Sequence, residues 1–168
     1  MSKKSPRPWT IKIQDIEPGE ALWSGEADPL KKEIWLGTNA PRENRPAVLA
    51  HEIAHAKLDR YPAKTNWEQD LREARADAYA YIKGWAGARG IEQIVEDRDE
   101  DWIYEGLRWG AQSLLRRRKI TPEEYKEFIQ ELEEVPGYHK TSYFSKEGRR
   151  EQEEWWQRAR EEAGRENA

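Results

Sequence analysis

His51-Glu52-Ile53-Ala54-His55 is the stretch of this chain that decides how the rest is interpreted. On an α-helix, residues four apart lie on one face with Cβ atoms roughly 5–6 Å apart, so His51 and His55 can point the same way. Two imidazoles at this spacing can bind one zinc ion. Glu52 lies beside the first ligand, where it can take a proton from water that the ion activates. The stretch predicts a zinc site with His51 and His55 as ligands and Glu52 as general base.

The residues around the motif favour a helix. Pro46 suits the first helical position, and no Gly or Pro follows it before Leu58. Leu49, Ile53 and Ala56 recur at helical spacing, so we expect this neighbouring face to pack inward. The motif should then lie on a helix with one buried flank and one flank open to a cleft.

A third protein ligand is expected, because catalytic zinc usually holds three protein ligands and a water. Glu73 is the candidate, since it lies 18 residues after His55 in a stretch, residues 71–80, that contains no helix breaker. The gap allows the first helix to end near Asp59 or Arg60 and a second helix to return beside it. Asp77 lies four residues after Glu73, on the same face, and could accept a hydrogen bond from the far nitrogen of a ligating histidine.

Other assignments remain open for the third ligand. Glu73 could instead be a surface carboxylate that pairs with Lys or Arg, because 37% of the chain is charged. Asp59 follows the second histidine by four residues and could face the site, but it falls at the expected fraying end of the helix. His139 is the only other histidine, and it could be a ligand, a transition-state donor or a solvated loop residue.

The His-Glu-x-x-His and Glu-x-x-x-Asp motifs together resemble those of gluzincins, the peptidase group that includes thermolysin. More narrowly, Glu-x-x-Ala-Asp-x-Tyr-Ala at residues 73–80 is similar to the Glu-x-x-Ala-Asn-x-Phe-Ala of the ImmA/IrrE family of small intracellular metallopeptidases. The resemblance covers roughly residues 30–85. It implies a zincin-like fold, Zn²⁺ bound by His51, His55 and Glu73, Glu52 as general base, and limited proteolysis of an intracellular protein.

Three strands are predicted ahead of the motif helix, at residues 9–13, 21–24 and 33–37. Residues 34–36 could form a cleft edge to which an extended peptide substrate adds by backbone pairing, or they could belong to an ordinary core hairpin. After Gly90 the chain is predicted to be helical, and Thr121-Pro122-Glu123-Glu124 is a capping box that begins one helix. We therefore predict a single α+β domain at residues 1–145 and a charged helix or arm at 146–168.

The segment at residues 138–144 is predicted to be a loop rich in hydrogen-bond donors. In gluzincins a Tyr or His from the C-terminal side stabilises the oxyanion, so the resemblance makes Tyr138 and His139 candidate catalytic residues, with Tyr143 as a further option.

Composition limits the other classes of function. The net charge of −4, with both signs interspersed, argues against a general nucleic-acid-binding protein. The chain contains no cysteine, and no apolar stretch approaches the length of a membrane span, so we expect a cytoplasmic protein without a membrane partner.

The expected partner is a protein or peptide substrate. The alternative is a non-catalytic interaction module with a structural metal, which would bind a protein through the C-terminal helix that carries Trp155 and Trp156. Hydrolysis of a non-peptide amide is a third possibility.

Overall fold

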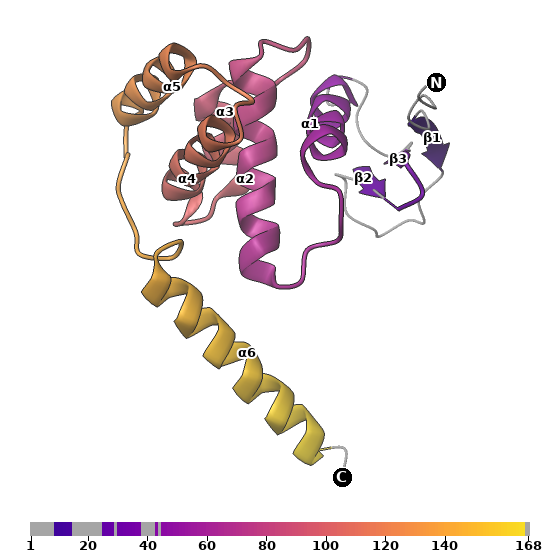
Figure 1. Ribbon diagram of the computed structural model, residues 1–168, viewed down its shortest axis with the longest axis vertical. Coiled ribbons are helices and arrows are strands. Elements are labelled where there is room, and N and C mark those ends of the chain that lie inside the picture. The colour runs from indigo at the N-terminus through magenta and orange to yellow at the C-terminus, as the bar shows by residue number, and fades with distance from the viewer. Residues whose placement is uncertain (1–8, 15–24, 29, 38–42, 44, 167–168) are drawn as a thin grey trace, which may run out of the picture. The chain divides into compact units, whose positions relative to one another are not determined.

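The computed structural model describes residues 9–14, 25–28, 30–37, 43 and 45–166. Within these residues it contains both helices and a small sheet, so the predicted α+β class is confirmed (Figure 1). The elements are β1 (Thr10–Gln14), β2 (Gly25–Asp28), β3 (Glu33–Gly37), α1 (Arg45–Leu58), α2 (Asn66–Ile82), α3 (Ile91–Arg98), α4 (Ile103–Arg116), α5 (Pro122–Glu134) and α6 (Lys146–Glu166). None of the described helices is long and apolar enough to cross a membrane.

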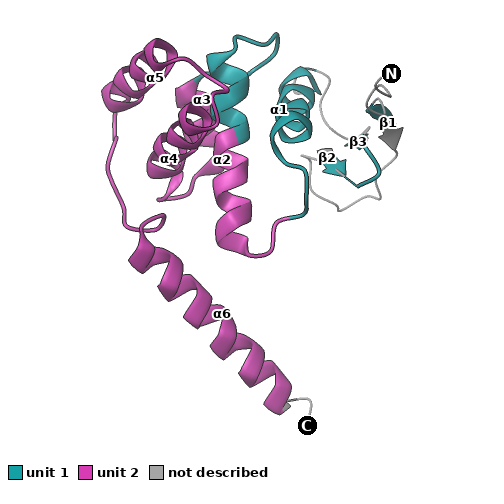
Figure 2. Cartoon of the chain, in the orientation of Figure 1, with its two compact units in different colours: residues 1–62, 76–90 teal, residues 63–75, 91–168 magenta. Residues whose placement is uncertain are grey.

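The chain forms two compact units (Figure 2). The first comprises residues 1–62 and 76–90, and the second comprises residues 63–75 and 91–168. Helix α2 runs from one unit into the other without a break. Helix α6 begins at Lys146, where the predicted arm begins, and belongs to the second unit. The domain boundary predicted at residue 145 stays a prediction.

The sheet of the first unit has the strand order β1-β3-β2. β1 pairs with β3 in parallel and β2 pairs with β3 in antiparallel, so Ile34 of β3 has Ile11 on one side and Ala27 on the other. The strand predicted at 33–37 is confirmed, the one at 9–13 is shifted by one residue, and the one at 21–24 lies outside the described residues. The prediction of a cleft edge at 34–36 is wrong, because neighbouring strands already occupy both sides of β3. The core-hairpin alternative is the one the structure supports.

Helix α1 packs against β2 and β3 within the first unit. Its buried residues include Glu52 and His55 of the motif itself. The prediction that Leu49 and Ile53 lie on an inward-packing face of this helix is wrong in part. Both side chains are only half-buried, and together with Trp85 they line a groove of about 680 Å³. The buried side of the helix instead carries Val48, Ala50, Glu52, Ala54, His55 and Leu58.

The loop after α2 approaches the start of α1 closely. Gly87 has a φ of +82°, and a Cβ atom built on it would lie 2.4 Å from Cβ of Pro46. Both the backbone conformation and the lack of space therefore require glycine at this position.

In the second unit, α4 packs directly on the first part of α2. A Cβ atom built on Gly110 would lie 2.8 Å from the Cα atom of Arg75, so only glycine permits this approach. The predicted capping box is confirmed at the start of α5. The backbone N–H of Glu124 donates to Thr121 Oγ1 at 3.1 Å, and the backbone N–H of Thr121 donates to Glu124 Oε1 at 2.9 Å.

Candidate metal site

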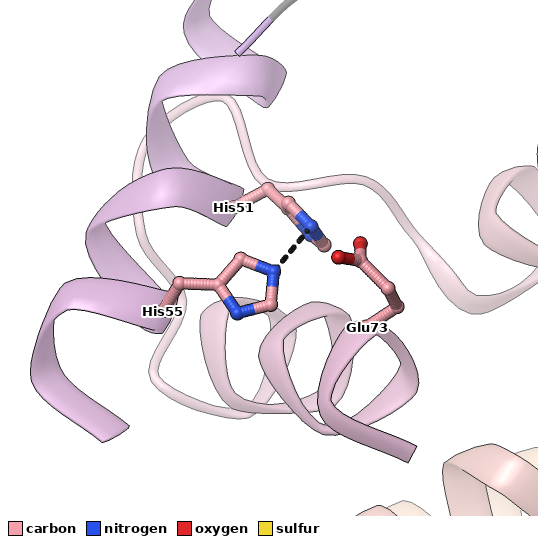
Figure 3. A group of neighbouring side chains, drawn as sticks. All are labelled: His51, His55 and Glu73. Atoms are coloured by element: carbon pink, nitrogen blue, oxygen red, sulfur yellow. Dashed lines mark hydrogen bonds between the residues drawn. The ribbon is translucent and has the colours of Figure 1, made fainter. Parts of the chain in front are cut away.

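Helix α1 places the two motif histidines side by side, as the spacing predicts. The ring centroids of His51 and His55 are 4.5 Å apart, and the planes are nearly perpendicular at 85°. Their Nε2 atoms lie 2.9 Å from each other (Figure 3). Both rings therefore direct the same nitrogen toward one point.

The opposite nitrogen of each ring contacts a carboxylate. His51 Nδ1 lies 2.6 Å from Asp77 Oδ1, and His55 Nδ1 lies 2.7 Å from Asp59 Oδ2. The predicted hydrogen bond to Asp77 is therefore confirmed. Asp59 follows the last residue of α1, as expected, but it is buried against His55 and not part of a fraying end. Because it contacts the far nitrogen, Asp59 is an orienting partner of His55 and not a third ligand beside it.

These contacts define the chemistry that each histidine can offer. An ionised carboxylate only accepts hydrogen bonds, so we assign the ring proton of both His51 and His55 to Nδ1. Each Nε2 atom then presents a lone pair, and the two lone pairs face each other at 2.9 Å. A cation coordinated by both nitrogens suits this arrangement. Zinc-binding histidines characteristically donate their other N–H to a carboxylate in the same manner. The donor set fits a zinc ion.

Helix α2 contributes the third candidate ligand. Glu73 lies one turn before Asp77, on the same unbroken helix. One ligand atom each from His51, His55 and Glu73 can be chosen so that all lie within 4.8 Å of one another. Figure 3 shows the Glu73 carboxylate directed toward the two rings. Within the part of the chain that the structure describes, these three residues form a group that could hold a metal ion.

The Glu73 carboxylate also has protein partners. Oε1 accepts a hydrogen bond from Gln69 Nε2 at 2.7 Å, and Oε2 accepts one from Arg98 Nη2 at 3.1 Å. Glu73 thus forms the ion pair expected of an ordinary helix carboxylate and also lies beside the histidines. The two roles are compatible, because a carboxylate offers about four lone-pair positions.

Glu52 is buried, with 7% of its surface exposed. Charged residues are rarely buried to this degree unless they are paired. Its burial in the centre of the motif is consistent with the predicted role, and its assignment as general base stays a prediction.

Tyr138 and His139 lie in the second unit, where both rings pack edge-on against Tyr104. The Tyr138 hydroxyl accepts a hydrogen bond from Arg108 Nη1 at 3.2 Å. His139 is exposed, and its Nδ1 lies 2.9 Å from the carbonyl oxygen of Gly137. Their assignment as oxyanion-stabilising residues stays a prediction.

The third option, Tyr143, is engaged elsewhere. Its hydroxyl donates to Asp70 Oδ2 at 2.6 Å. Burial, followed by the hydrogen bond and the charge of Asp70, raises the pKa of Tyr143 well above its ordinary value. Burial likewise raises the pKa of Asp70, although the Tyr143 hydrogen bond opposes this shift. The Tyr143 hydroxyl therefore stays protonated and donates its hydrogen bond to Asp70.

Two neighbours of the site were missed from the sequence. Gln69 lies four residues before Glu73, a spacing that signals contact on a helix and could have identified it. Arg98 lies 25 residues away, at the end of another helix, and no local pattern points to it.

Comparisons of the chain with family models, with curated proteins and with solved structures find no match. The interpretation of the site therefore depends on its own geometry.

Proposed function

We propose that this protein is a zinc-dependent metallopeptidase of the zincin type, in which His51, His55 and Glu73 hold the ion. The observation that carries the proposal is the convergence of two histidine Nε2 atoms at 2.9 Å while both Nδ1 atoms contact carboxylates. When bound, zinc would supply Lewis-acid chemistry, lowering the pKa of a water toward about 7 and polarising the scissile carbonyl.

The chain's own residues supply orientation and proton transfer. Asp77 and Asp59 keep the ring protons on Nδ1, so that both Nε2 lone pairs stay directed at the site. Glu52 takes a proton from the attacking water and later delivers it to the leaving amine, so the carboxylate is regenerated in each cycle. The resemblance to the ImmA/IrrE family supports limited proteolysis of an intracellular, cytoplasmic protein as the biological role.

The substitution Glu52→Gln tests this proposal, because it removes the base and keeps a side chain of the same shape. Zinc-loaded wild type and variant would be incubated with a library of peptides, and new termini would be identified by mass spectrometry. We expect cleavage by the wild type only, with equal zinc content in both proteins. Glu92→Gln, at an exposed position of α3, is the matched control and should cleave like the wild type. Cleavage by Glu52→Gln at the wild-type rate would refute the proposal.

One feature of the second unit favours the non-catalytic alternative. Trp155 on the charged helix α6 is 53% exposed, which is unusual for so large an apolar side chain. Beside it, Trp156 and Trp67 line a groove of about 440 Å³. A binding role predicts that a photo-reactive residue at position 155 cross-links to a protein partner in cells. If zinc-loaded wild type cleaves no peptide and such a cross-link forms, the interaction module becomes the better account.

A further inference from the structure

The carboxylate of Glu73 is held from two directions, and neither donor belongs to the metal-binding motif. Gln69 Nε2 donates to Oε1 at 2.7 Å from the preceding turn of α2, and Arg98 Nη2 donates to Oε2 at 3.1 Å from the end of α3. All three residues belong to the second unit. We propose that Arg98, assisted by Gln69, is a positioning residue that fixes the Glu73 carboxylate for metal binding. This inference rests on the proposed function.

The geometry favours positioning over competition with the metal. An Arg that sequestered a carboxylate would be expected to engage both oxygens through its planar fork. Here Arg98 Nη2 donates to one oxygen, Oε2, while the other oxygen, Oε1, accepts a hydrogen bond from Gln69. A carboxylate offers about four lone-pair positions, so these two hydrogen bonds are compatible with a role of Glu73 as a metal ligand.

Partial burial gives the contact its energetic value. The side chains of Arg98 and Glu73 are 25% and 23% exposed, so the pair is less hydrated than an ordinary surface ion pair, whose contribution is about 0–1 kcal/mol. A Glu side chain has three rotatable bonds, and fixing them before the ion arrives removes an entropic cost from binding. Partners of this kind typically affect metal affinity by about 10–100-fold.

The test is the zinc dissociation constant of the full chain, measured by competition with a chromophoric chelator and without any substrate. We expect Arg98→Ala to weaken zinc binding by about 10-fold or more, and Arg98→Lys to recover part of the loss by keeping a charged donor. Arg108→Ala is the matched control: Arg108 is also 25% exposed and forms an ion pair with Glu133 in the same unit. It should bind zinc like the wild type.

A double-mutant cycle separates positioning from a general effect on the fold. If Arg98 acts through Glu73, Arg98→Ala should cost much less zinc affinity in a Glu73→Ala background than in the wild type. The visible spectrum of the cobalt-substituted protein should also change in Arg98→Ala and not in Arg108→Ala. If Arg98→Ala folds poorly, Arg98→Gln, which keeps a neutral donor, replaces it in the cycle.

Unchanged or tighter zinc binding by Arg98→Ala would overturn the inference, and so would an equal loss in both backgrounds. These outcomes are distinct from failure of the proposed function. A wild type that binds zinc and cleaves no peptide contradicts the peptidase and leaves the role of Arg98 to be decided by the affinities. A wild type that binds no zinc overturns both.

Discussion

Replacing Asp77 tests whether the carboxylates behind the histidines set the metal affinity. Asp77 Oδ1 lies 2.6 Å from His51 Nδ1, and the Asp77 side chain is 5% exposed. Loss of such a partner lowers metal affinity by about 10–100-fold, which corresponds to roughly 1.4–2.7 kcal/mol. Asp77→Ala removes a short, buried contact altogether, so we expect a loss near the upper limit. Asp77→Asn keeps an acceptor oxygen without its charge, so we expect a loss near the lower limit.

The assay is a zinc titration in competition with a chromophoric chelator at neutral pH. Glu105→Gln is the control, because Glu105 is also buried and accepts a short hydrogen bond, but from Thr141. It should leave zinc affinity close to that of the wild type. The reasoning is refuted if Asp77→Ala binds zinc as tightly as the wild type, or if Glu105→Gln loses as much affinity as Asp77→Asn.

Three further predictions concern stability. Gly87→Ala should lower the free energy of unfolding by about 2–4 kcal/mol, because the position has a positive φ and the new Cβ atom would clash with Pro46. Gly84→Ala should lower it by only about 1–2 kcal/mol, because Gly84 has a φ of +65° but no atom within 4 Å of the added Cβ. Equal losses for the two variants in denaturant titrations would contradict this prediction. Because the pKa of Tyr143 is raised in the folded protein, its contribution to the free energy of unfolding is fully present below the ordinary tyrosine pKa of about 10. That contribution is lost as the pH rises from there through the raised pKa. The stability difference between wild type and Tyr143→Phe should therefore narrow in alkaline solution, and a constant difference would count against the assignment. Zinc at about 100 times its dissociation constant should raise the free energy of unfolding by about 2.7 kcal/mol, and a chelator should reverse the gain. If zinc does not shift the unfolding temperature in calorimetry, the folded chain has no such site.

The parts of the fold that follow from local patterns were predictable from the sequence. The motif helix, the strand at 33–37 and the helix that begins at Pro122 depend on spacing, alternation and a capping box, which are properties of a few neighbouring residues. The contact between His51 and Asp77 was also predictable, because two helices with known periodicity place only a few side chains opposite each other. Residues 21–24, predicted as a strand, lie outside the described residues, so this prediction is untested.

Non-local arrangement was not predictable in the same way. β1 pairs with β3 across the intervening chain, so the order β1-β3-β2 depends on a long-range choice that alternation within a strand does not encode. The half-buried state of Leu49 and Ile53 has the same origin, since it depends on which neighbours cover a given helix face. Arg98 reaches Glu73 from the end of a separate helix, and only the packed structure reveals that contact.

The metal content of the purified chain tests the central claim most directly. Elemental mass spectrometry would compare the wild type with Glu73→Ala, each supplied with zinc and then freed of unbound metal. The site described here predicts close to one zinc per wild-type chain and a clearly lower content in the variant. A wild type that retains no zinc, or a variant that retains as much as the wild type, would contradict a centre built from His51, His55 and Glu73.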